Sequence, residues 1–261
     1  MNLEKTSVGF ALHSYGKNHP GSELFVQFHS IAINMLEKCD IKITYIGADE
    51  GSYSGKYVKF KGRTHKRILK EEFDKIRSFD FVATPQDSDA PAYDKFANIG
   101  ISYTGYDKGL LLYLDINETF ISLDSESFAG LIRPMVELYD WDFGYGFSDL
   151  ARKEASVYII GGGNDQYSEE EEKALDLWHA AKPEERLDRL RDVYPYNIIS
   201  ERQLNHLCPE YGTLRAYIEN QNNTTFERLT EAGLHLWRIA DNAELLRVQN
   251  ELAAMSLLIA R

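Results

Sequence analysis

Three consecutive glycines, at positions 161 to 163, stand shortly before a run of four glutamates, and glycines at such a place could cradle a phosphate. Phosphate loops work because glycine lets backbone N–H groups approach the phosphate while the positive end of a helix faces it. Here the spacing is neither G-x-G-x-x-G nor that of a P-loop, which ends in Lys followed by Ser or Thr. The segment therefore offers no nucleotide-binding motif.

The glutamates instead mark the start of a helix. Ser168 is followed three residues later by Glu171, which is the spacing of a capping box. Glutamates in the first turn stabilise a helix through its dipole and would repel a phosphate. Apolar residues at helical spacing then predict a buried stripe of Ala174, Leu177, Trp178 and Ala181. We expect a capped acidic helix whose carboxylates face either water or a partner.

A second acidic segment, DWDFGYGF at residues 140–147, joins two carboxylates to aromatic rings and glycines just after an expected helix. An acidic and aromatic loop is a plausible interaction surface, because aromatic side chains bury a large area at low cost in entropy. The alternative is that the rings pack into the core. The candidate partner-binding residues are Asp140, Asp142, Asp165, Glu169, Glu170 and Glu172.

Catalysis finds little support in the sequence. Asp87 and Asp89 form a carboxylate pair that could hold a metal, but no EF-hand pattern continues from them, and a turn is the simpler interpretation. The seven histidines form no metal-ligand spacing, and Cys39 and Cys208 lie in no metal, redox or nucleophile motif. We expect a protein that is not an enzyme and takes no metal or cofactor. The alternative is a small-molecule hydrolase or transferase that uses Asp87, Asp89 and a histidine.

The elements that must position these residues alternate between strands and helices. In the first half we expect a strand at 7–14, a helix at 23–39, strands at 40–47 and 56–60, a helix from Thr64 and a strand at 79–84. This order is that of the ferredoxin-like βαββαβ motif. A hairpin at 101–116 and an amphipathic helix at 125–140 follow.

The second half is expected to repeat this order around inserted helices. It reads as a strand at 155–160, the acidic helix, short helices at 183–194, 200–207 and 213–221, a hairpin at 225–239, a helix at 242–254 and a strand at 256–259. The expected fold class is therefore α+β, with mixed or antiparallel sheets and packed helices. Residues 1–124 and 125–261 would form two halves, each of them ferredoxin-like, or a single compact unit.

Charge and hydropathy restrict the partners. The net charge is −12, and residues 131–261 hold 23 acidic against 14 basic side chains. This balance argues against general affinity for nucleic acid and suits a basic partner as well as simple solubility. No signal peptide follows Met1, and no run approaches the roughly 20 apolar residues that span a bilayer. We expect a soluble, cytoplasmic protein with no membrane partner.

The second half also resembles a known family. The succession WDFGYGF, VYIIGGGN, ALDLW, PYNIISERQL, GTLRAYI, LHLWRI and SLLI, between Ser125 and Ile259, resembles the immunity protein 52 family of bacterial polymorphic toxin systems. The resemblance implies an α+β antitoxin that binds and neutralises a cognate effector, typically a nuclease with a restriction-endonuclease-like fold delivered by a type VI secretion system. It assigns no role to individual residues.

Three functional classes follow from these observations. The favoured hypothesis is an immunity protein that binds and neutralises a cognate secreted toxin. The expected toxin is a nuclease effector of a type VI secretion system, because an acidic protein can be steered to a cleft built for polyphosphate. The second is the hydrolase or transferase described above. The third is a structural subunit of a secretion apparatus, which would self-assemble instead of forming a stoichiometric complex with a toxin.

Overall fold

The computed structural model describes residues 5–49, 56–71, 76–84, 96–104, 108–123 and 126–261. The main sheet contains β1 (Thr6–Ser14), β2 (Tyr45–Asp49), β3 (Lys56–Lys59), β4 (Ser78–Ala83), β5 (Ala97–Thr104), β6 (Gly109–Asn117), β7 (Phe143–Leu150), β8 (Tyr196–Ser200), β11 (Thr224–Arg228) and β12 (Leu234–Ile239). A separate small hairpin pairs β9 (Leu207–Cys208) with β10 (Gly212–Thr213). Asp87 and Asp89 lie outside the described residues.

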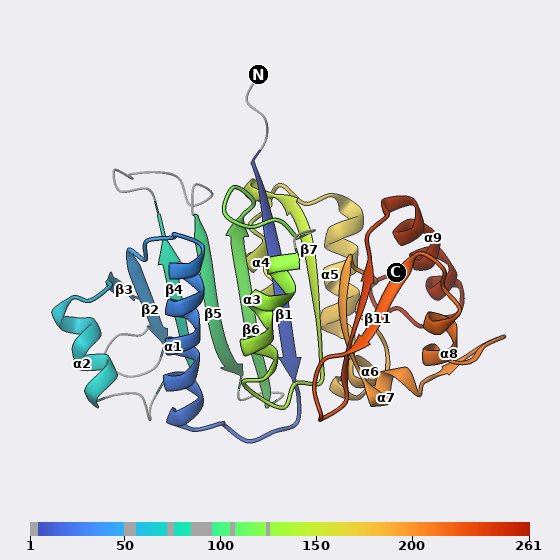
Figure 1. The fold of residues 1–261 in the computed structure, drawn as a ribbon, viewed down its shortest axis with the longest axis horizontal. Helices are drawn as coiled ribbons and strands as arrows, with labels where there is room; N and C mark the ends of the chain where they lie inside the picture. The colour runs from blue at the N-terminus through green and yellow to red at the C-terminus, as the bar shows by residue number, and fades with distance from the viewer. Residues whose placement is uncertain (1–4, 50–55, 72–75, 85–95, 105–107, 124–125) are drawn as a thin grey trace.

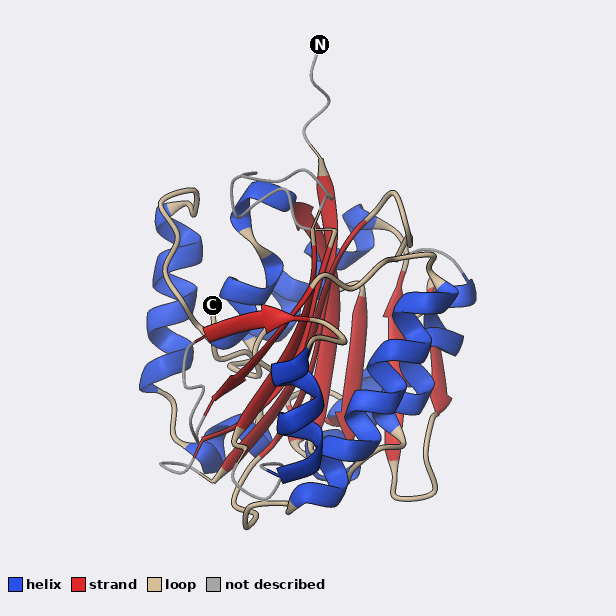
Figure 2. Ribbon diagram, turned by 90° about the vertical axis from the view of Figure 1, so that its left-hand side faces the viewer, coloured by secondary structure: helices blue, strands red, loops and turns tan. Residues whose placement is uncertain are grey.

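Helices cover both faces of this sheet (Figure 1, Figure 2). They are α1 (Ser22–Lys38), α2 (Arg63–Glu71), α3 (Glu126–Val136), α4 (Ala155–Ile160), α5 (Glu169–Ala180), α6 (Pro183–Asp188), α7 (Glu201–Leu204), α8 (Leu214–Glu219) and α9 (Asn242–Ala254), with a short 3-10 turn at Ala151–Lys153. The α+β class expected from the sequence is confirmed.

The strand order is β11-β12-β8-β7-β1-β6-β5-β4-β2-β3, and every neighbouring pair is antiparallel. The sheet does not contain the expected ferredoxin-like halves. In that motif the first strand pairs with other strands of the same βαββαβ unit, here expected at 7–84, whereas β1 lies between β6 and β7, which are both outside that unit. The first and last parts of the chain therefore share one continuous sheet, with β1 near its centre (Figure 1).

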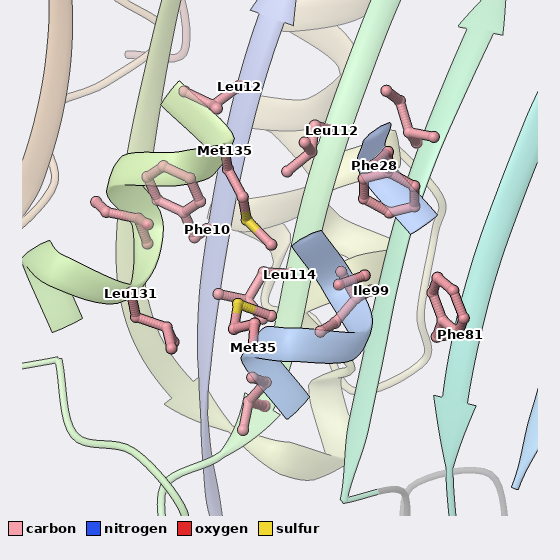
Figure 3. Close-up of a cluster of buried hydrophobic side chains, with 14 of the residues drawn as sticks. Phe10, Leu12, Phe28, Met35, Phe81, Ile99, Leu112, Leu114, Leu131 and Met135 are labelled. Carbon is pink, nitrogen blue, oxygen red and sulfur yellow. The ribbon is translucent and has the colours of Figure 1, made fainter. Parts of the chain in front are cut away.

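One face of the sheet carries the largest apolar core. Because alternate side chains of a strand point to opposite faces, Phe10 and Leu12 of β1 lie on the side covered by α1 and α3. Phe28 and Met35, seven residues apart in α1, are both buried there, as Figure 3 shows together with Met135 of α3. The helical spacing seen in the sequence thus places one face of α1 against the sheet.

The opposite face, called the back face below, is covered by the later helices. Ala11 of β1 and the rings of Phe143 and Tyr145 in β7 pack there against Ile159 of α4 and Trp178 of α5. A third core lies at the end of the sheet that carries β8 and β12, where α7, α8 and α9 close over it. In Figure 2, seen along the sheet, helices stand on both sides of the strands.

Residues 155–160 form helix α4 and not the expected strand. The carboxylate of Asp115, in β6, accepts hydrogen bonds from the backbone N–H and the hydroxyl of Ser156, both at 3.1 Å, and so caps the start of the helix. Gly161 ends it with a φ of 82°, and the N–H groups of Gly161 and Gly162 bond back to the carbonyls of Tyr158 and Val157. The glycines therefore close one helix and do not open a phosphate loop.

Three further segments differ from expectation. The segment DWDFGYGF is not a loop, because most of it is strand β7, in which large rings alternate with glycines and the rings of Phe143, Tyr145 and Phe147 are buried. Residues 256–259 form no strand of the sheet, and Leu258 makes only an isolated bridge to Leu190. The expected helix at 183–194 ends at Asp188.

Candidate functional site

The first turn of α5 is held in place by the capping box that the sequence predicted. The N–H of Glu171 donates to Oγ of Ser168 at 3.2 Å, and the N–H of Ser168 donates to Oε2 of Glu171 at 2.7 Å. Lys153, just after β7, forms an ion pair with Glu171 at 2.7 Å. Partial burial acts to raise the pKa of Glu171, but the hydrogen bonds from Lys153 and Ser168 outweigh it and hold that pKa below its ordinary value.

The other carboxylates of this turn point to solvent. Asp165, Glu169, Glu170 and Glu172 are exposed. None of these four forms an ion pair with a residue that the structure describes. Their charges are therefore available to an approaching partner, and we call these four residues the acidic turn.

A recess of about 320 Å³ borders the acidic turn. Glu170 and Leu177 of α5 line one side of it, and Tyr158 and Arg261 line the other. Leu177 was expected in the buried stripe of α5, but its side chain is 37% exposed, and Leu175 is buried with Trp178 instead. An apolar side chain beside uncompensated carboxylates is an arrangement found at protein interfaces.

The two remaining candidate residues lie elsewhere and are already engaged. Asp140 is 74% exposed and forms an ion pair with Lys17 at 2.8 Å. Asp142 is partly buried, and its Oδ2 accepts the backbone N–H of Tyr15 at 2.7 Å. Burial raises the pKa of Asp142, although the hydrogen bond from Tyr15 and the charge of Lys17 act against the rise. Asp142 therefore holds the chain that follows β1 against the start of β7.

The six candidate residues do not form one surface. Asp140 and Asp142 precede Phe143, the first residue of β7, whereas the acidic turn is tied to Lys153, beyond the last residue of β7. The eight residues of β7 span roughly 25 Å, at about 3.3 Å per residue. The acidic turn and the Asp140–Asp142 segment therefore lie toward opposite ends of β7.

The back face also contains a cavity of about 560 Å³ that no sequence motif indicated. It lies where β1 and α5 both end, and Thr104 of β5 and Gly109, Leu110 and Leu111 of β6 line part of its wall. Its walls include His13, Tyr15, Ile159, Trp178, Lys182 and Arg186. Tyr15 and Arg186 are 171 positions apart, so no local spacing could have signalled the site.

Arginine side chains shape the wall of this cavity. The Arg186 guanidinium donates to the carbonyls of Trp178 at 3.0 Å and His179 at 3.3 Å, and so caps the last turn of α5. It also lies 4.8 Å from the centre of the Trp178 ring. Arg191 is buried behind this wall, 5.2 Å from the same ring.

Within the residues that the structure describes, no three His, Cys, Asp or Glu side chains come together as a metal site. No helix in this part of the chain is both long and apolar enough to cross a bilayer.

Neither a protein-family model nor a curated protein sequence matches the chain. Among solved structures, the Pseudomonas aeruginosa type VI secretion system (T6SS) protein PA0821 is similar, with a TM-score of 0.60 and 14% sequence identity. The match covers 96% of this chain and 76% of that chain. At this identity the likeness establishes a shared fold.

Proposed function

We propose that this chain is an immunity protein that binds a cognate secreted toxin and neutralises it. Two findings support the proposal from different directions. The fold, over almost the whole chain, is like that of a protein named for the T6SS. The second half resembles the immunity protein 52 family in the order of its motifs.

The acidic turn is the observation that carries this proposal. Its four carboxylates are exposed and make no ion pair with a described residue, and one of the four residues, Glu170, lines a recess together with the apolar side chain of Leu177. A nuclease has a cleft that attracts polyphosphate, and such a cleft attracts an acidic surface for the same reason. The toxin proposed here is therefore a nuclease effector, which the acidic turn would approach at its substrate cleft.

The test is coexpression with the toxin encoded beside the gene of this chain. We expect the protein to restore growth and to copurify with the toxin as a stoichiometric complex. Restored growth without a complex would contradict neutralisation by direct binding. A structural subunit of a secretion apparatus would neither restore growth nor bind the toxin, and it would form assemblies of its own.

A further inference from the structure

Strand β11 forms one end of the main sheet, and no described strand pairs with its outer edge. In an antiparallel ladder the N–H and C=O of one residue point to the same side, and successive residues alternate. The N–H of Leu229 donates to the carbonyl of Leu234 at 2.8 Å, so Leu229 faces β12. By alternation, the backbone groups of Thr224, Phe226 and Arg228 face away from the sheet. None of these groups is hydrogen-bonded to a residue that the structure describes.

The outer edge of β11 is also accessible and regular. Thr225, Glu227 and Arg228 are exposed, and Thr224 and Phe226 are partly exposed. β11 contains no proline, and its register with β12 runs without a bulge. Natural sheets commonly protect an open edge with such interruptions, because unpaired N–H and C=O groups accept another strand. The edge of β11 is therefore suited to main-chain pairing with an added strand.

Contacts on one face of β11 hold its central residue in place. The Phe226 ring stacks on the His235 ring with 5.2 Å between centres, and the Arg215 guanidinium lies 5.8 Å from the centre of the Phe226 ring. Glu201 joins these two neighbours, because it accepts a hydrogen bond from Arg215 at 2.8 Å and its other oxygen lies 2.8 Å from Nε2 of His235. An edge that is ordered before binding loses less conformational entropy when a strand is added.

The charge beside this edge indicates which kind of strand fits. Glu227 is exposed and forms no ion pair with a described residue. The adjacent cation, Arg228, points to the other face of the sheet, and its guanidinium donates to the carbonyls of Thr230 and Glu231. Opposite charges that face each other directly across two strands stabilise their pairing. The added strand should therefore carry a basic residue opposite Glu227 and an apolar residue opposite Phe226.

A second copy of this chain does not provide such a strand through its own β11. Antiparallel pairing between two outer edges places outward-facing residues opposite one another, so only odd-numbered residues of the second copy can face Glu227. The nearest of these are Asn223, Thr225, Glu227, Leu229 and Glu231, and none of them is basic. A glutamate opposite Glu227 would destabilise the pair. The charge of this edge thus favours a foreign strand.

We propose that the outer edge of β11 binds an extended segment of another protein, which joins the sheet as an added strand and places a lysine or arginine opposite Glu227. β11 lies three strands away from β7, whose end the acidic turn adjoins. The surface is separate from the one assigned to the toxin. This inference therefore goes beyond the proposed function, and its test needs no toxin.

The probe is a blocked peptide in which valine alternates with lysine over the length of β11, titrated into the full chain by calorimetry at low salt. One comparison peptide has glutamate in place of lysine. The other keeps lysine but carries N-methyl groups on the valine amides, which removes the N–H groups that should face β11. We expect one lysine peptide to bind per chain, at least tenfold more tightly than either comparison peptide. Equal binding of the three peptides, or no binding of the lysine peptide at millimolar concentration, would overturn the proposal.

A charge reversal locates the peptide on the protein. Glu227→Lys should reverse the preference, so that the glutamate peptide binds more tightly than the lysine peptide. Glu210→Lys makes the same change in net charge at an exposed residue between β9 and β10, and it should leave the preference unchanged. A preference that is the same in both variants would place the peptide elsewhere and refute the proposal.

A backbone change tests the pairing itself. Thr224→Pro removes an outward-facing N–H at the first residue of β11 and leaves the bonds to β12 intact, so it should weaken binding of the lysine peptide at least threefold. In the unaltered protein, the NMR signal of the Phe226 amide should shift on titration. An unshifted Phe226 amide would contradict strand addition. Self-association of the unaltered chain in sedimentation, abolished by Thr224→Pro, would show that a second copy occupies the edge instead.

Discussion

His29 of α1 and His65 of α2 face each other with their Nε2 atoms 3.2 Å apart. The backbone N–H of Lys61 donates to Nδ1 of His65 at 2.9 Å, so the ring proton of His65 lies on Nε2. Nε2 of His29 must then accept this proton's hydrogen bond, which requires a neutral His29. Two neutral imidazoles thus join α2 to α1.

This pair should make the protein less stable in mild acid. Burial, and then the charge of His65, lower the pKa of His29 from 6.5 to about 4. The pKa of His29 is lower in the folded protein than in the unfolded chain. The contribution of the neutral His29 ring to the free energy of unfolding is therefore complete above about pH 6.5 and is lost as the pH falls toward 4. We expect the urea midpoint to decrease over this range, and an NMR titration to give His29 a pKa near 4.

The variant His29→Gln provides the control, because it keeps an acceptor for His65 but does not titrate. Its urea midpoint should fall less steeply between pH 6.5 and 4 than that of the unaltered chain. An NMR pKa of 6.5 for His29 would show that the proposed tautomers are wrong.

Gly161 should tolerate no side chain. Its φ is 82°, and a Cβ built there would lie 2.4 Å from Cε1 of His179. Gly161→Ala should therefore lower the free energy of unfolding by about 1–3 kcal/mol. Gly163→Ala, where a Cβ meets no atom within 4 Å and φ is not positive, should change it by less than about 0.5 kcal/mol. Similar losses in the two variants, measured by chemical denaturation, would contradict the assigned end of α4.

The Ser168 cap should contribute measurably to α5. Ser168→Ala removes the acceptor of the Glu171 N–H and should cost about 1 kcal/mol. Ser168→Thr retains the hydroxyl and should cost less. Hydrogen exchange at the Glu171 amide is the direct measurement, and an exchange rate unchanged by Ser168→Ala would show that the cap does not form in solution.

If the acidic turn contacts the toxin, its charge should govern the rate of association. Replacing Glu169, Glu170 and Glu172 with Lys should slow association with the toxin at least tenfold and weaken its dependence on salt. The matched control replaces three exposed glutamates elsewhere, Glu210, Glu227 and Glu231, and makes the same change in net charge. Stopped-flow kinetics that cannot distinguish the two triple variants would remove the acidic turn from the interface.

Local signals in the sequence predicted the elements that local interactions determine. The helix at 242–254 was predicted with the bounds that α9 has, and the capping box of Ser168 and Glu171 forms as expected. In both cases the deciding contacts lie within four residues along the chain.

Elements that depend on distant contacts were predicted less well. A short apolar run such as 155–160 fits a strand or a buried helix equally, and Asp115 and Gly9, far away in the chain, favour the helix. A Cβ at Gly9 would lie 2.8 Å from Cβ of Ala155, so this glycine makes room for α4 on β1. The alternation of rings and glycines in β7 was a signal of a strand, but the glycines and carboxylates favoured a loop interpretation.

The position of β1 also has a consequence for synthesis of the chain on the ribosome. The two neighbours of β1 in the sheet are β6 and β7, and the synthesis of β7 is complete only when the ribosome has added Leu150. At about 5–20 residues per second, one hydrogen-bonding edge of β1 waits on the order of ten seconds for its partner. During that interval the nascent chain exposes one unpaired edge of an apolar strand at the centre of its future sheet, and such an edge can pair with the strand of another chain.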